Sequence, residues 1–184
     1  DFSDVGLDYW VSGYGTGGTV SGVGRVLREK SPGTKIILTE PENAALIGSE
    51  LKQDRHSDNT PATSHSSWNP HLIQGWTPDF IPFVLQEAID NNYFDKLLPV
   101  SGEQGITWAK RLARAEGIIT GISGGSTFAI AMEVAKDAPP DSNILCMLPD
   151  TGERYLSSPL FEEIPEEMTD DEKKISLSTP NYQL

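Results

Sequence analysis

The stretch from residue 8 to residue 39 constrains the fold of this chain more than any other. Residues 8–13, Asp-Tyr-Trp-Val-Ser-Gly, have the aromatic and β-branched character of a short buried strand and end in a glycine cluster. Residues 20–30 have the apolar face and basic last turn of a helix, and residues 35–39 form a second strand pattern. A strand, a helix and a strand in so short a stretch make a βαβ unit, which requires parallel strands.

The same alternation continues along the chain. Residues 49–70 form a long polar excursion, of a length that is usually functional or mobile. Beyond it, Ser101 and Gln104 have the spacing of a helix capping box, and Gly117 marks the end of that helix. The other predicted elements are helices over 80–91 and 127–136, strands over 97–100, 118–122 and 143–148, and a Gly/Ser turn over 123–126. The sequence therefore predicts an α/β fold, with a twisted, mostly parallel sheet and helices on both faces.

Three loops are expected to gather on one side of this sheet. Ligands of open parallel sheets bind beyond the carboxyl ends of the strands, where we place loops 13–19, 123–126 and 149–155. The first runs Gly-Tyr-Gly-Thr-Gly-Gly-Thr between a strand and a helix. Its glycines allow the backbone to approach an anion, and the helix N-terminus adds a partial positive charge. This loop therefore predicts a phosphate site.

The glycine spacing leaves the kind of phosphate open. Gly13, Gly15 and Gly18 match the dinucleotide-binding pattern, and Glu40 stands where a ribose-binding acid is expected. Thr16 and Thr19 instead favour a terminal phosphate monoester, which has more oxygens to satisfy. Glycine spacing alone does not decide between the two.

The other two loops offer further candidates. A hydroxyl at Ser123 or Ser126 either caps the following helix or contacts a ligand. In the third loop Asp150 and Glu153 accompany Arg154, for which a structural ion pair is the expected role.

Histidine and cysteine predict no catalytic or metal centre. His56, His65 and His71 are 9 and 6 residues apart, which fits no helix-borne metal pair, and we expect them to be exposed in loops. Cys146 lies in an apolar strand pattern and is expected to be inert and buried. A serine hydrolase would need a Gly-x-Ser-x-Gly segment, and the sequence has none.

Charge and hydropathy exclude several classes of protein. The net charge of −13, from 27 acidic and 14 basic residues, repels a nucleic-acid backbone. No apolar run approaches the roughly 20 residues that a membrane span needs. A single cysteine suits a reducing compartment, so we expect a cytoplasmic protein that binds neither nucleic acid nor membrane. Residues 161–184 are expected to form a solvated acidic tail.

Five motifs, in order along the chain, resemble one known family. They are Gly15-Thr16-Gly17-Gly18-Thr19, His71-Leu72-Ile73-Gln74-Gly75, Phe80-Ile81-Pro82, Glu116-Gly117-Ile118 followed by Gly121-Ile122-Ser123-Gly124-Gly125, and Gly152-Glu153-Arg154-Tyr155-Leu156-Ser157. Together they resemble cysteine synthase (O-acetylserine sulfhydrylase), a pyridoxal-phosphate enzyme of fold type II with a tryptophan synthase β-like fold. The resemblance runs from about residue 1 to residue 161.

The resemblance implies a role for the residues that match. Ser123 would contact the pyridine nitrogen, and a neutral hydroxyl there suits β-elimination and replacement over transamination. Gly75 would lie near the substrate. The phosphate of pyridoxal 5′-phosphate would be held by Gly15, Thr16, Gly17, Gly18 and Thr19.

The chain also departs from the family. The family's Schiff-base lysine and its substrate-carboxylate loop lie in an N-terminal half that nothing here matches. None of the lysines present is a convincing substitute: Lys30, Lys35, Lys52, Lys96, Lys110, Lys136, Lys173 and Lys174. Gly75-Trp76-Thr77-Pro78-Asp79 replaces a glycine-rich continuation, and Ser123-Gly124-Gly125-Ser126 replaces the usual Ser-Ser-Gly-Ala. A cystathionine β-synthase or another type II β-replacement enzyme therefore stays open.

The expected function follows from the resemblance. Residues 1–160 would be the C-terminal, larger-domain portion of a homodimeric cysteine synthase whose N-terminal half is missing here. With that half it would make L-cysteine from O-acetyl-L-serine and sulfide, and it would dock the C-terminal tail of serine acetyltransferase. Two alternatives remain: a Rossmann-type nucleotide-binding domain that relies on Glu40, and a regulatory module that binds peptide without turnover.

Overall fold

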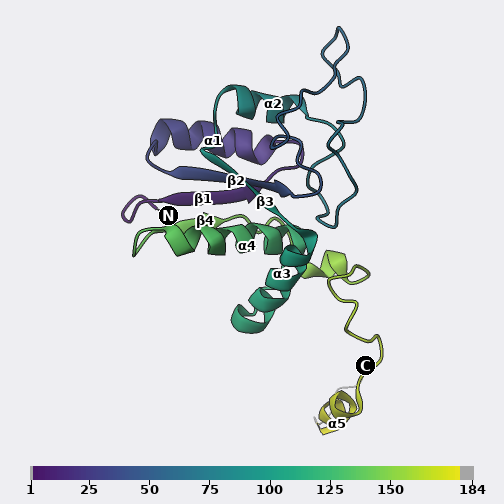
Figure 1. Cartoon of the computed structure of the whole chain (residues 1–184). Coiled ribbons are helices and arrows are strands. Elements are labelled where there is room, and N and C mark those ends of the chain that lie inside the picture. Colours follow the sequence, from purple (N-terminus) through teal and green to yellow (C-terminus); the bar gives the residue numbers. More distant parts are fainter. Residues whose placement is uncertain (1, 179–184) are drawn as a thin grey trace.

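A computed structural model describes residues 2–178, which form a parallel sheet with helices on both faces (Figure 1). Its four strands are β1 (Tyr9–Gly13), β2 (Lys35–Pro41), β3 (Lys96–Val100) and β4 (Ile144–Cys146), in the order β3-β2-β1-β4. All three neighbouring pairs are parallel. The predicted fold class is confirmed.

The helices divide between the two faces of the sheet. Helices α1 (Gly18–Lys30) and α2 (Phe83–Asp90) lie on one face, and α3 (Gly102–Glu116) and α4 (Ile122–Asp137) lie on the other (Figure 1). Helices α1, α2 and α3 begin and end within three residues of the predicted positions, whereas α4 ends within one residue of the predicted position but begins five residues earlier than predicted. Ser101 and Gln104 form the predicted capping box, and Gly117, with φ 70°, ends α3 in the left-handed conformation.

Alternate residues of the central strands supply two cores. Trp10 and Leu38 belong to the cluster under α1 and α2, whereas Val11 and Ile37 belong to the cluster that contains residues of α3 and α4. Successive side chains of a strand point to opposite faces, so a strand buried on both sides reads as a continuous apolar run. The central strands β1 and β2 both follow this rule.

Two predicted elements around residue 120 are wrong. Residues 118–122 form no strand, because α4 already begins at Ile122 and Thr120 makes only an isolated bridge to Thr151. The Gly/Ser stretch 123–126 is the first turn of α4 and not a loop. A side chain on Gly125 would meet the carbonyl oxygen of Gly105 at 2.0 Å. Glycine is needed there for close packing of α3 on α4, a use that the sequence pattern does not separate from a turn.

The strand predicted over 143–148 is shorter than expected. β4 has only three residues, and Leu145 is 37% exposed. This strand is the edge of the sheet and is not covered on both faces.

The C-terminal part lies away from the sheet. After a short 3-10 helix, η1 (Gly152–Tyr155), helix α5 (Asp170–Ser178) has no buried residue and lies apart from the other helices (Figure 1). The predicted tail, 161–184, is described only as far as residue 178. The first residue of the predicted domain, 1–160, lies outside the described residues. No helix in residues 2–178 is long and apolar enough to cross a membrane.

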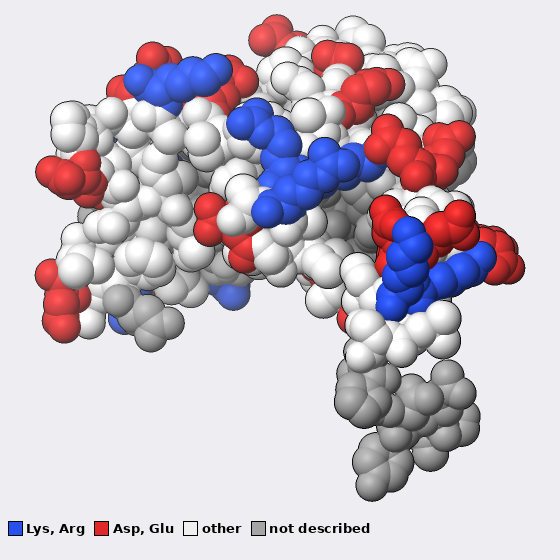
Figure 2. Space-filling model, turned by 90° about the horizontal axis from the view of Figure 1, so that it is seen from below, with Lys and Arg blue, Asp and Glu red and all other residues white. Residues whose placement is uncertain are grey.

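Charges of both signs are interspersed on the surface. Seen from below (Figure 2), acidic side chains are spread over the face, and basic ones form only short groups among them. Lys110, Arg111 and Arg114 of α3 line one shallow hollow. Even there Lys110 pairs with Glu163 at 3.2 Å.

Candidate functional site

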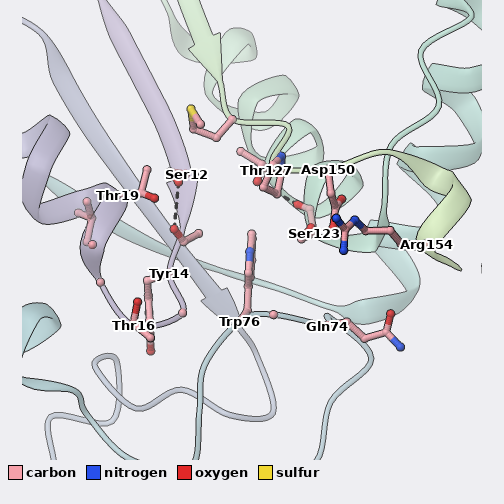
Figure 3. Close-up of a pocket in the computed structure, with 18 of the residues that line it drawn as sticks. Ser12, Tyr14, Thr16, Thr19, Gln74, Trp76, Ser123, Thr127, Asp150 and Arg154 are labelled. Carbon is pink, nitrogen blue, oxygen red and sulfur yellow. Dashed lines mark hydrogen bonds between the residues drawn. The ribbon is translucent and has the colours of Figure 1, made fainter.

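A cavity of about 480 Å³ opens at the carboxyl ends of β1 and β4 (Figure 3). The chain runs from β1 outward through β2 to β3 and then returns to place β4 on the other side of β1. Such a reversal of strand order is where open α/β sheets bind ligands. The structure brings residues from all three predicted segments, 13–19, 123–126 and 149–155, to this cavity.

The glycine loop is shaped by Gly17 and by the start of α1. Gly17 has φ 92°, and a side chain there would come within 2.5 Å of the backbone nitrogen of Leu85. The first hydrogen bond of α1 runs from the amide of Ser21 to the carbonyl of Gly17, at 2.9 Å. The amides of Gly18, Thr19 and Val20 that precede it therefore have no acceptor within the helix. The loop offers these donors, and the positive end of the helix, to a ligand in the cavity.

Buried hydrogen bonds hold Tyr14 in this loop. The Tyr14 hydroxyl donates to Glu40 at 2.5 Å, and Glu40 also accepts from the amides of Ile47, at 3.1 Å, and Gly48, at 2.8 Å. Burial raises the pKa of Glu40, although these hydrogen bonds act in the opposite direction. Burial and the neighbouring carboxylate raise the pKa of Tyr14 well above its usual range.

The ribose-binding role predicted for Glu40 is wrong. Glu40 is 2% exposed, and it is absent from the cavity lining. Its oxygens are occupied by Tyr14 and two amides, so it supports the loop from behind and faces no ligand. The dinucleotide interpretation depended on this residue.

Ser123 lies at the opposite end of the cavity, in the first turn of α4, and is 2% exposed. Beside it, the Tyr155 hydroxyl donates to one carboxylate oxygen of Asp150. Burial and the hydrogen bond to Asp150 raise the pKa of Tyr155 to about 12. The other oxygen of Asp150, Oδ1, is buried and has no hydrogen-bond partner in the described residues.

Of the two alternatives for Ser123 and Ser126, helix capping is wrong. The N-cap of α4 is Gly121, and no side chain caps this helix. Ser126 instead donates to the carbonyl of Ile122 at 2.9 Å and does not reach the cavity. Ser123 is thus the one of the two serines that the structure places at the cavity.

The predictions for the histidines, Cys146 and Arg154 are confirmed in part. His56 is exposed as predicted, whereas His65 is buried and accepts from the amide of Ser67 at 3.2 Å. Cys146 is half-buried and not fully buried as expected, and burial raises the pKa of its thiol. Arg154 forms no ion pair in the described part of the chain and lines the cavity instead, so the predicted pairing is wrong.

Two further side chains have outcomes of their own. His71 is half-buried, with Nε2 3.2 Å from the carbonyl oxygen of Thr77, so the prediction of an exposed loop histidine is wrong for it as well. Glu153 is exposed and accepts from the Thr151 hydroxyl at 2.8 Å, away from the cavity lining. Residues 2–178 contain no group of three or more His, Cys, Asp or Glu that could hold a metal ion.

Trp76, to which the sequence pattern assigns no role, places its indole in the middle of the cavity (Figure 3). It lies between the glycine loop and Ser123. The motif around Gly75 could have indicated this residue, because a large aromatic side chain replaces a small one there.

The cavity fits a phosphorylated planar ring. Its volume lies within the range of small-molecule sites, about 300 to 1,000 Å³. A side chain at Gly15 would meet the carbonyl oxygen of Gly75 at 2.5 Å, whereas nothing lies within 4 Å of the corresponding position at Gly18. The start of α1 is thus open at Gly18. At the other end, the unpartnered Oδ1 of Asp150 is available to a donor.

Comparison with known proteins agrees with this geometry. The family described as "Pyridoxal-phosphate dependent enzyme" matches residues 2–150. O-ureido-L-serine synthase from Streptomyces lavendulae is 40% identical over 179 residues, which cover 97% of this chain and 49% of the relative. A cysteine synthase from Staphylococcus aureus (strain Mu50 / ATCC 700699) is 34% identical over 160 residues, 87% of this chain and 45% of the relative.

Solved structures agree on the fold. The crystal structure of an O-ureido-L-serine-bound mutant of O-ureido-L-serine synthase superposes with a TM-score of 0.78 at 39% identity, covering 98% of this chain and 50% of that one. The chain spans about half the length of the curated relatives it matches. It belongs to the fold-type II pyridoxal-phosphate dependent enzymes, in the group that includes cysteine synthase and O-ureido-L-serine synthase.

Proposed function

We propose that this chain supplies the cofactor-phosphate and ring-nitrogen sites of a cysteine synthase, which makes L-cysteine from O-acetyl-L-serine and sulfide. One observation carries the proposal. The open N-terminus of α1 and the buried hydroxyl of Ser123 lie at opposite ends of a single cavity. A phosphate at one end and a ring nitrogen at the other are the two polar ends of pyridoxal 5′-phosphate.

The glycine loop would hold the phosphate. Its free amides and the helix dipole offset the negative charge of a dianion in a protein of net charge −13. The hydroxyls of Thr16 and Thr19 are exposed at the same place and add donors. The residues proposed for this role are Gly15, Thr16, Gly17, Gly18 and Thr19.

Ser123 would hold the ring nitrogen. A neutral hydroxyl accepts or donates a hydrogen bond without fixing a proton on that nitrogen, which suits β-replacement. When bound, pyridoxal phosphate supplies the electron sink for bond breaking at the α-carbon of the amino acid. Gly75, in the cavity lining beside Trp76, would lie next to the amino-acid substrate.

The lysine that binds the cofactor would come from outside this cavity. No lysine of the described residues lines it. We therefore propose that residues 1–160 act as a C-terminal, larger domain together with a segment equivalent to the other half of the relatives, and that 161–184 form an acidic tail. A homodimer that docks the C-terminal tail of serine acetyltransferase, in the cytoplasm, completes the proposal.

A second candidate is the formation of O-ureido-L-serine. It is supported by the 40% identity to the enzyme of that name. L-cysteine and O-ureido-L-serine are both alanines with a substituent on the β-carbon, so the two activities differ in the nucleophile. A cystathionine β-synthase-like enzyme would differ in the same way.

The test begins with the tagged protein isolated from its own cells. Borohydride fixes any cofactor bound to lysine, and intact masses are then measured under denaturing conditions. We expect a pyridoxyl-lysine on a polypeptide that contains this sequence or copurifies with it. The absence of any pyridoxyl adduct would overturn the proposal.

The same preparation separates the candidate activities. It is given O-acetyl-L-serine with sulfide, homocysteine or hydroxyurea in turn. Sulfide as the preferred nucleophile supports cysteine synthase, hydroxyurea supports the second candidate, and homocysteine supports the cystathionine β-synthase alternative. In each assay Ser123→Ala is compared with Ser126→Ala, since only Ser123 reaches the cavity.

A further inference from the structure

Trp76 packs partly against the core on the α3 and α4 side of the sheet, and it also lines the cavity. Trp10 is 2% exposed among core residues, and Trp108 packs edge-to-face on Phe128, with ring centroids 5.6 Å apart. Trp76 is half-buried, and its indole projects between the glycine loop and Ser123 (Figure 3). The cavity of about 480 Å³ is the space that remains with the indole in place.

The backbone on both sides of Trp76 is constrained to aim it there. Gly75 has φ 83° and Thr77 has φ 39°, so the tryptophan stands between two residues in the left-handed region. For threonine, a β-branched residue, this conformation is strained. The amide of Thr77 donates to the carbonyl of Tyr14 at 2.9 Å, which ties the turn to the glycine loop. Strain that the fold maintains at a cavity is a feature of functional sites.

The last residue of β1 makes room for the indole. A side chain on Gly13 would come within 2.0 Å of Cζ2 of Trp76. The indole therefore lies directly against the backbone at the carboxyl end of the strand. Glycine at position 13 and tryptophan at position 76 fit together, and a larger residue at 13 would displace the ring.

A planar ligand that reaches from the glycine loop to Ser123 must pass this indole. Aromatic rings attract one another in offset-stacked or edge-to-face arrangements, beyond the effect of the area they bury. We propose that Trp76 is the stacking residue of the cavity and holds the pyridine ring of the cofactor, while the glycine loop holds only its phosphate. This inference rests on the proposed function, because it assumes a phosphorylated ring between the two ends.

The proposal predicts that two small-molecule probes depend on different parts of the cavity. Inorganic phosphate needs the glycine loop alone, whereas pyridoxine 5′-phosphate needs the loop and Trp76. Pyridoxine 5′-phosphate has no aldehyde and so forms no bond with lysine. Both are titrated by calorimetry into the full chain, as wild type and as the variants Trp76→Ala, Trp76→Phe and Trp108→Phe.

We expect Trp76→Ala to weaken binding of pyridoxine 5′-phosphate about tenfold, the upper part of the range for an aromatic pair, and to leave phosphate affinity unchanged. Trp76→Phe keeps an aromatic ring and should lose no more than about threefold. Tryptophan fluorescence gives a second readout. The ligand should quench it in wild type and in Trp108→Phe, but much less in Trp76→Phe.

Each of the other possible binding results contradicts a different part of the proposal. If Trp76→Ala binds pyridoxine 5′-phosphate as tightly as wild type, the stacking role is wrong and the proposed function survives. If Trp76→Phe, with an unchanged melting temperature, loses phosphate as well, Trp76 shapes the loop and does not stack. If wild type binds neither probe, the proposed function fails.

Discussion

The two ends of the cavity differ in how their residues are held in place. At the glycine-loop end Tyr14, Gly17 and Glu40 are all buried, and Glu40 accepts hydrogen bonds from the Tyr14 hydroxyl and from the amide of Gly48. At the Ser123 end, Asp150 and Tyr155 belong to a segment that follows a three-residue edge strand. Arg154, beside them, is exposed.

This difference indicates which end can vary. A change at the glycine-loop end disturbs the sheet and α1 together, because Glu40 is part of β2 and Gly17 caps the helix. At the Ser123 end, Ser123 and Tyr155 are buried, but the segment that carries Asp150 and Tyr155 follows a short edge strand, so a change there disturbs fewer contacts with the sheet. We infer that the fold holds the phosphate position more firmly than it holds the segment that carries Asp150 and Tyr155.

The largest expected effect is that of Gly17→Ala. The substitution places a side chain at φ 92°, within 2.5 Å of the backbone of Leu85. We expect a loss of about 4 kcal/mol of unfolding free energy, from left-handed strain and overpacking together. Chemical denaturation followed by circular dichroism measures it.

Gly18→Ala is the matched control for that variant. Nothing lies within 4 Å of the added methyl group, and alanine favours a helix over glycine by about 1 kcal/mol. Its stability should equal or slightly exceed that of wild type. Equal stability of the two variants would show that the loop is not fixed in the way described here.

The next effect is that of Glu40→Ala. The change leaves the Tyr14 hydroxyl and the amides of Ile47 and Gly48 buried without their acceptor. We expect a loss of about 3 kcal/mol in unfolding free energy and weaker binding of inorganic phosphate. Glu40→Gln retains an acceptor and loses about 1 kcal/mol. If the two variants are equally stable, the hydrogen bonds of Glu40 do not hold the loop.

Much of the fold could be predicted from the sequence because each pattern there had one physical cause. Trp10, Val11, Ile36 and Ile37 are apolar because both sheet faces are covered. The capping box at Ser101 and the glycine at 117 are local signals and were placed correctly. The stretch 118–126 failed because glycine serves both turns and close helix packing, and only the contact of Gly125 with Gly105 decides between them.

The candidate site could be predicted only in part. The glycine loop and Ser123 were identified, since their motifs are continuous in the sequence. The ribose-binding alternative for Glu40 stayed open because its partner, Tyr14, is 26 residues away and the sequence does not show that their side chains meet. Trp76 received no role because its importance depends on contact with Gly13, across the cavity wall.

The smallest expected effect tests the Ser123 end through Tyr155. Its pKa is raised to about 12, against 10.0 for an unburied tyrosine, so the unfolded chain ionises first as pH rises. The stability that this shift contributes is fully present below pH 10 and is lost as pH rises through about 12. Tyr155→Phe removes it.

Between pH 9 and pH 11, wild type should therefore lose about 1 kcal/mol more unfolding free energy than Tyr155→Phe, after allowance for screening by solvent at the cavity mouth. Urea titrations at several pH values give the two slopes, and tyrosinate absorbance at 295 nm shows whether the ionisation near pH 12 disappears in the variant. Because the variant also leaves Asp150 without its donor, the comparison uses the slopes and not the absolute stabilities. If unfolding free energy falls with pH equally steeply in wild type and in Tyr155→Phe, Tyr155 is as accessible to water as the exposed Arg154. The Ser123 end of the cavity is then not held as the structure describes it.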